Sequence, residues 1–124
     1  MGIKEIRSQD WEAFCRKITE LRKEALLTVE VVRPDGRRDQ IARAVPLRNM
    51  SFEKMDGCSD QILLDLESGR EQPITHSIVD PIHILLRPST NGSYNPMEIS
   101  AENGTTLLTF QPALRADIAE APRA

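Results

Sequence analysis

The sequence has few residues of several kinds on which function often depends. Among 124 residues, five are aromatic, two are cysteine and two are histidine. Two cysteines are too few for a disulfide framework or a four-cysteine zinc site. The longest aliphatic runs, such as Ile84-Leu85-Leu86, are far shorter than the ~20 residues that span a bilayer. The N-terminus has no apolar signal-peptide core. We therefore expect no membrane partner and a cytoplasmic location.

The motifs of common catalytic and metal sites are also missing. There is no glycine-rich phosphate loop, no Gly-x-Ser-x-Gly elbow and no His-Glu-x-x-His helix. Asp56, Asp60, Asp65 and Glu67 are close in sequence but lack the spacing of a calcium loop. Neighbouring aspartates disfavour the thiolate that a nucleophilic Cys58 would need. The sequence therefore predicts no catalytic residue, no metal and no cofactor.

Charged residues are unevenly distributed along the chain. Sixteen lysines and arginines against 19 aspartates and glutamates give a formal net charge of −3. Residues 1–48 hold 11 basic and 8 acidic side chains, whereas residues 49–124 hold 5 and 11. This balance disfavours nucleic acid as a partner but leaves room for a local anion-binding surface.

The periodicity of apolar residues changes after the first 25 residues. Trp11, Phe14, Ile18, Leu21 and Ala25 follow at spacings of three and four, which predicts an amphipathic helix over residues 9–24. Alternating apolar and polar residues then predict short strands. The expected ranges are 27–32, 37–45, 61–67, 74–79, 82–87, 97–100 and 105–110.

These elements indicate an α+β fold. We expect an N-terminal amphipathic helix and six or seven short, mostly antiparallel strands that form a small bent sheet or barrel. Pro46 is expected to keep the second strand at an edge or to mark its end. Residues 1–112 are assigned to a single domain and residues 113–124 to a C-terminal tail.

His76 is one candidate for ligand binding. It lies between Ile74 and Ile78 on the apolar side of a short strand. This position favours a neutral histidine in the core or at an interface, and the alternative is a histidine that contacts a ligand.

The other candidates are arginines around the turn of the first hairpin. Guanidinium groups bind phosphate or carboxylate through paired hydrogen bonds. Acidic residues lie among these arginines, which favours local ion pairs, and no aromatic residue is interleaved to stack on bases. The candidate ligand-binding arginines are Arg33, Arg37, Arg38 and Arg43.

These features favour a non-enzymatic binding or assembly module whose small-molecule ligand is unidentified. Leu63, Val32 and Leu85 point away from the expected core, which motivates a homo-oligomer. One alternative is RNA binding through the arginine hairpin and His76. Another is a small hydrolase or isomerase that uses His76 with an acidic partner, and this function requires a pocket.

Two resemblances add to this interpretation. A helix with Ser-Gln-Asp-Trp-Glu-Ala-Phe, a Pro-Asp-Gly hairpin, Ile-Thr-His-Ser-Ile-Val-Asp-Pro-Ile-His-Ile and a final Glu-Asn-Gly-Thr-Thr-Leu-Leu-Thr-Phe together resemble a small prokaryotic family of unknown function. That resemblance covers nearly the whole chain and implies no activity. More weakly, residues 9–87 are similar to Sm-like barrels, including the bacterial RNA chaperone of that fold. This similarity implies an RNA contact for His76, although Thr75 stands where the chaperone has lysine.

Overall fold

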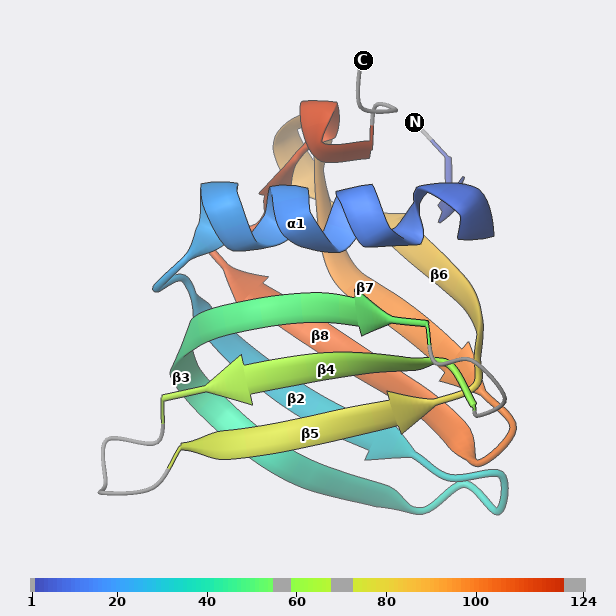
Figure 1. Cartoon of the computed structure of the whole chain (residues 1–124). Coiled ribbons are helices and arrows are strands. Elements are labelled where there is room, and N and C mark those ends of the chain that lie inside the picture. The colour runs from blue at the N-terminus through green and yellow to red at the C-terminus, as the bar shows by residue number, and fades with distance from the viewer. Residues whose placement is uncertain (1, 55–58, 68–72, 120–124) are drawn as a thin grey trace.

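Alternating apolar and polar residues build most of the chain into antiparallel strands around one α-helix (Figure 1). A computed structural model describes residues 2–54, 59–67 and 73–119. Short 3₁₀ helices lie at Ser8–Asp10, Thr90–Gly92 and Ala116–Ala119. The remaining elements are β1 (Lys4–Ile6), α1 (Trp11–Arg22), β2 (Leu26–Val32), β3 (Arg38–Glu53), β4 (Gln61–Leu66), β5 (Ile74–Val79), β6 (Pro81–Pro88), β7 (Ser93–Ala101), β8 (Gly104–Gln111) and β9 (Leu114–Arg115).

The strands form one sheet in the order β1-β6-β7-β8-β2-β3-β4-β5, and β9 pairs with β7. Every pairing is antiparallel. The broad α+β prediction is confirmed, but the described residues contain nine strands instead of six or seven. The two strands at the ends of the order, β1 and β5, do not pair with each other, so the sheet is bent but not closed into a barrel.

The bend lies in β3, whose first half pairs with β2 and whose second half pairs with β4. Ala44 has a φ of 49° at an irregularity in the β2–β3 pairing, and its N–H donates to Thr28 Oγ1 at 3.0 Å. Pro46 follows, inside the strand, so the prediction that it ends the strand is wrong. The alternative, that the strand before it lies at an edge, agrees with the first half of β3, which pairs with β2 alone. Proline fits because β3 changes partner at this point, and the Pro46 carbonyl accepts from Glu67 N–H at 2.9 Å.

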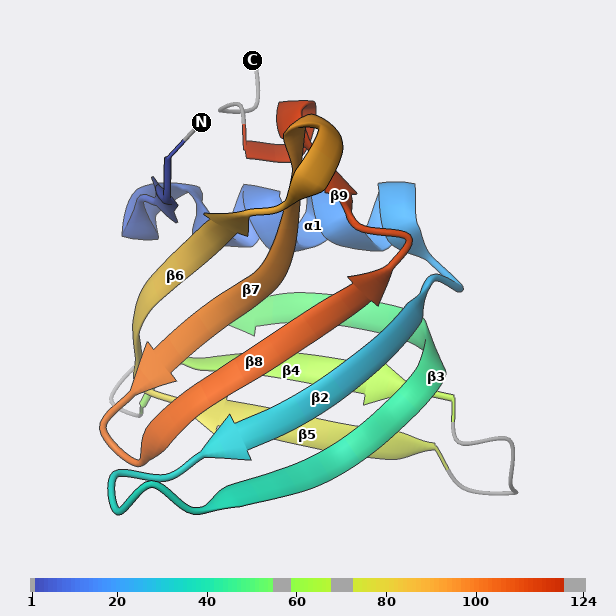
Figure 2. The same ribbon diagram turned by 180° about the vertical axis from the view of Figure 1, so that it is seen from behind.

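Helix α1 covers one open end of the bent sheet (Figures 1 and 2). It is shorter than the predicted 9–24, and its buried residues are Trp11, Phe14, Cys15 and Ile18. Leu21, predicted on the buried face, is 61% exposed. The difference arises because Cys15 belongs to the buried face. At 100° per residue this places the centre of that face away from Leu21, which lies at its margin in the last turn.

The same helix also covers a free edge of the sheet, along the second half of β3. Thr19 Oγ1 accepts from Met50 N–H at 2.9 Å, and it lies 2.8 Å from the Met50 carbonyl oxygen. Beyond the helix, Glu24 N–H donates to the Leu47 carbonyl at 2.7 Å, and Leu47 N–H donates to the Ala25 carbonyl at 2.9 Å. The backbone groups that Leu47 and Met50 direct away from β4 therefore lie in contact with α1 or the segment after it.

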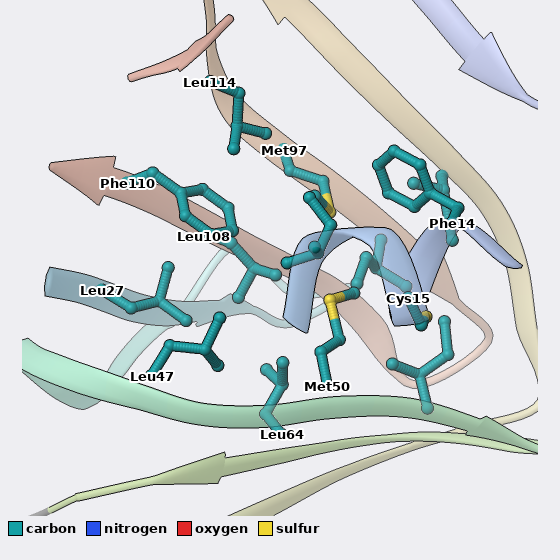
Figure 3. Packing of buried hydrophobic residues seen from close by; sticks show 14 of the residues in the cluster. Phe14, Cys15, Leu27, Leu47, Met50, Leu64, Met97, Leu108, Phe110 and Leu114 are labelled. Carbon is teal, nitrogen blue, oxygen red and sulfur yellow. The ribbon is translucent and has the colours of Figure 1, made fainter. Parts of the chain in front are cut away.

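The core lies between the two halves of the sheet and under α1. Figure 3 shows Leu27, Leu47, Met50, Leu64 and Phe110 converging there, all at most 2% exposed. The alternation predicted for β4 is confirmed, since its three inward residues are fully buried. No helix in the described ranges is long and apolar enough to cross a membrane.

The segment expected as a C-terminal tail is described as far as residue 119. Leu114 in β9 is fully buried and Ile118 is 3% exposed, and both belong to the core cluster. This part of residues 113–124 therefore packs on the domain.

Candidate ligand-binding cavity

The end of β5 and the β2–β3 and β7–β8 turns lie near one another on the right of Figure 1. Residues from these three segments line a cavity of about 210 Å³. The two turns and β5 are far apart in sequence, and the bend in β3 brings them together. The lining residues are Val31, Arg33, Ile41, His76, Ser77, Ile78, Val79, Ala101, Asn103, Gly104 and Thr106.

His76 contributes a half-buried imidazole to the cavity. It lies opposite Leu64 in the β4–β5 register, on the side of β5 that carries the buried Ile78. Its ring makes no hydrogen bond with the described residues. Burial lowers the pKa of His76 from the ordinary value of 6.5, because a low-dielectric surrounding disfavours the charged form. The ring is therefore neutral at pH 7, with one donor and one acceptor nitrogen.

Thr106 was missed at the level of sequence. It is 4% exposed, and it is the buried polar residue of the described part of the chain. Its hydroxyl has no hydrogen-bond partner among the described residues. The signal was present, because Thr106 lies two residues before Leu108 and so on the same inward side of β8 as Leu108 and Phe110. A threonine in that pattern marks a polar group directed inward.

Gly104 forms part of the wall through a conformation that side chains rarely adopt. Its φ is 139°, and a Cβ at this position would lie 2.6 Å from the Val32 carbonyl oxygen. Only glycine lets the β7–β8 turn approach the end of β2 this closely.

Arg33 is the charged member of the lining, and no aspartate or glutamate lies among the lining residues that the structure describes. Its side chain is about half exposed, and its Nε donates to Asp39. The two Nη groups are not part of that bond. A ligand with negative charge would therefore meet guanidinium donors at the mouth of the cavity.

The other candidate arginines lie outside the cavity. Arg37 Nε is 3.1 Å from Asp35 Oδ2, and Arg38 Nη1 is 3.5 Å from Glu30 Oε2. Arg43 is exposed on β3. The structure thus brings Arg33 together with His76 in one cavity. Arg33, Arg37 and Arg38 all form the local ion pairs that the sequence favoured.

The backbone of β5 forms one wall of the cavity. Asp80 N–H donates to the Asp60 carbonyl at 2.8 Å. Together with the register of β4 and β5, this bond shows which opposite residues are joined by backbone hydrogen bonds. Because such pairs alternate in an antiparallel ladder, Ile74, His76 and Ile78 bond β4 through their backbones. The intervening residues direct their N–H and C=O groups to the free edge, where no described backbone group bonds them. These residues are Thr75, Ser77 and Val79.

The two cysteines do not add chemistry to this site. Cys15 is fully buried, and burial raises the pKa of its thiol to about 12, which suppresses the reactive thiolate. Cys58 and Asp56 lie outside the described residues. Among residues 2–54, 59–67 and 73–119, no three His, Cys, Asp or Glu side chains are grouped to hold a metal.

The fold and the cavity define a class: an open, bent antiparallel sheet with a helix along the second half of β3 and a small cavity beside β5. The chain belongs to a family of unknown function, DUF5335, which matches residues 2–118. The predicted membership in such a family is confirmed. No curated protein and no solved structure matches the chain, so the weaker Sm-like resemblance gains no support.

Proposed function

We propose that the protein is a binding module that holds a carboxylate in this cavity. The observation that carries the proposal is the meeting of Arg33 with two polar side chains, His76 and Thr106, that have no partner among the described residues. The polar atoms of these two side chains are not fully enclosed by protein, so they are open to the cavity, where water or a ligand can bond them. A ligand that forms hydrogen bonds with these groups would take the place of water in the cavity.

The lining also indicates the body of such a ligand. Val31, Ile41 and Ile78 present aliphatic surface, which suits a short apolar group next to the carboxylate. The cavity, at about 210 Å³, is smaller than the roughly 300–1,000 Å³ of sites for drug-sized ligands. The expected ligand therefore has a small apolar part and one anionic end.

The alternatives have less support. A hydrolase or isomerase that uses His76 would need an acidic partner, and the described lining contains none. RNA binding would need several free arginines, yet Arg33, Arg37 and Arg38 each lie beside a carboxylate.

The homo-oligomer and the cytoplasmic location remain predictions. Leu63, one residue that suggested an oligomer, lies between Ser51 and Ser77 on the outer side of the sheet. Val32 and Leu85 are half-buried.

An NMR titration tests the proposal. Butyrate, with butyramide as the uncharged control, is added to ¹⁵N-labelled protein at up to about 20 mM, the range in which weak fragments bind. Butyrate should shift the amide signals of Ser77, Gly104 and Thr106. Arg33→Gln should weaken binding about tenfold, the effect of losing a charge-assisted hydrogen bond.

Arg37→Gln is the matched control, because Arg37 lies on the same hairpin but outside the cavity. It should bind butyrate as the wild type does. Equal shifts with butyrate and butyramide, or no shifts at these amides, would contradict the proposal.

A further inference from the structure

We infer that the carboxylate is the C-terminus of an extended polypeptide from a partner protein, which adds to β5 as a further strand. This inference rests on the proposed function for the position of the carboxylate at Arg33. It adds the class of ligand and the surface that recognises the remainder of it.

The edges of the sheet differ in how they are protected. The second half of β3 is bonded by α1 and the segment after it, as described above. The edge strand β1 has three residues, two of them the charged Lys4 and Glu5. The first half of β3 carries Arg38 and Arg43. Short length, charge and a covering helix are the means by which proteins block unwanted strand pairing.

Strand β5 has none of these protections among the described residues. It is six residues long, Ile-Thr-His-Ser-Ile-Val, and holds no lysine, arginine, aspartate or glutamate. Its free edge is therefore suited to accept another strand.

The free edge and the cavity are one continuous surface. Ser77 and Val79 line the cavity, and both direct backbone groups to that edge. The Ser77 hydroxyl points to the other side, where it donates to Gln61 Oε1 at 2.7 Å, and Thr75 Oγ1 likewise lies 3.0 Å from Asp65 Oδ1. Ser77 thus presents main chain, rather than side chain, to a ligand.

A polypeptide end satisfies more of this surface than a small acid. Its N–H and C=O groups pair with those of Ser77 and Val79, its carboxylate meets Arg33, and its last side chain lies among Val31 and Ile41. Main-chain bonds supply affinity and the small cavity supplies selectivity for the last residue. The limited volume of the cavity suits one side chain and a carboxylate.

The experiment uses two pools of hexapeptides with random sequences, fluorescently labelled at the N-terminus. One pool has free C-terminal carboxylates and the other has amidated C-termini. Anisotropy and retention on immobilised protein are measured for wild type, Ser77→Pro and Ser77→Ala. Proline removes one N–H from the free edge and leaves the ladder to β4 intact. Alanine removes only the bond to Gln61, so it is the matched control.

We expect the immobilised protein to retain free-carboxylate peptides at least about tenfold more than amidated ones. This factor corresponds to the affinity lost with one charge-assisted hydrogen bond. Ser77→Pro should abolish retention, and Ser77→Ala should leave it within twofold. Equal retention of both pools, or retention by Ser77→Pro, overturns the inference. So does a dimer that dissociates in Ser77→Pro, because a second copy would then occupy the edge.

The butyrate titration separates the two levels of the account. Butyrate binding without peptide enrichment overturns this inference alone and leaves the proposed function standing. If neither butyrate nor peptides bind, both are overturned.

Discussion

Replacing Thr19 by valine tests whether α1 protects the edge of β3. The substitution keeps the shape of the side chain and removes the hydroxyl that accepts from Met50 N–H at 2.9 Å. Met50 is 1% exposed, so water cannot easily take the place of the lost acceptor. The Met50 amide, and the carbonyl 2.8 Å from the same hydroxyl, would remain unpaired.

Leaving a buried donor without a partner costs about 1–3 kcal/mol. For a chain of 124 residues, 1 kcal/mol corresponds to a change in melting temperature of about 4 °C. We therefore expect Thr19→Val to lower the melting temperature by roughly 4–12 °C. Thr19→Ser keeps the hydroxyl and should cost less than about 1 kcal/mol.

Urea unfolding gives the free energy, and hydrogen exchange of the Met50 amide gives the location of the effect. In Thr19→Val this amide should exchange faster than in the wild type. If Thr19→Val unfolds at the wild-type urea concentration and the Met50 amide keeps its protection, the hydroxyl does not cover this edge and the reasoning is refuted.

Three further predictions concern other parts of the structure. Burial lowers the pKa of His76 below 6.5, so the unfolded chain binds the proton more strongly. The free energy of unfolding should therefore fall as the pH falls through about 6.5 and level off below the folded-state pKa. In urea unfolding between about pH 8 and 5, His76→Gln should remove this dependence. Gly104→Ala should destabilise the fold by about 3 kcal/mol through strain and the clash with β2. Gly36 has a φ of 91° but open space around it, so Gly36→Ala is the control and should cost about 1 kcal/mol. Equal melting temperatures for the two alanine variants would contradict the close approach at Gly104. Leu21→Gln should change the free energy of unfolding by less than about 0.5 kcal/mol, whereas Phe14→Ala should cost about 3–5 kcal/mol; a large loss in Leu21→Gln would place that side chain in the core.

Local pattern was sufficient for elements with an unambiguous period. The alternation in β4 identified its buried face because one side of that strand is entirely aliphatic. The bend in β3 was missed because its cause is not local. Ala44 adopts a positive φ without being glycine, and Pro46 is accommodated only because β3 changes partners there.

The candidate site was predictable as residue types but not as a place. His76 and Arg33 were identified by their chemistry, but they are distant in sequence and meet only through the order of strands in the sheet. Arg37 and Arg38 carried the same chemical signal and lie outside the cavity. Whether β5 has a free edge depends on which strands pair with it, and the periodicity of apolar residues does not predict strand pairing.

The measurement that tests the central claim most directly is amide hydrogen exchange along β5. In the free protein, the amides of His76 and Ile78 should be protected by their bonds to β4, whereas those of Thr75, Ser77 and Val79 should exchange rapidly. Addition of the selected free-carboxylate peptides should protect Ser77 and Val79. If both are as protected as His76 before any peptide is added, or unprotected when the peptides are bound, the edge of β5 is not the binding surface.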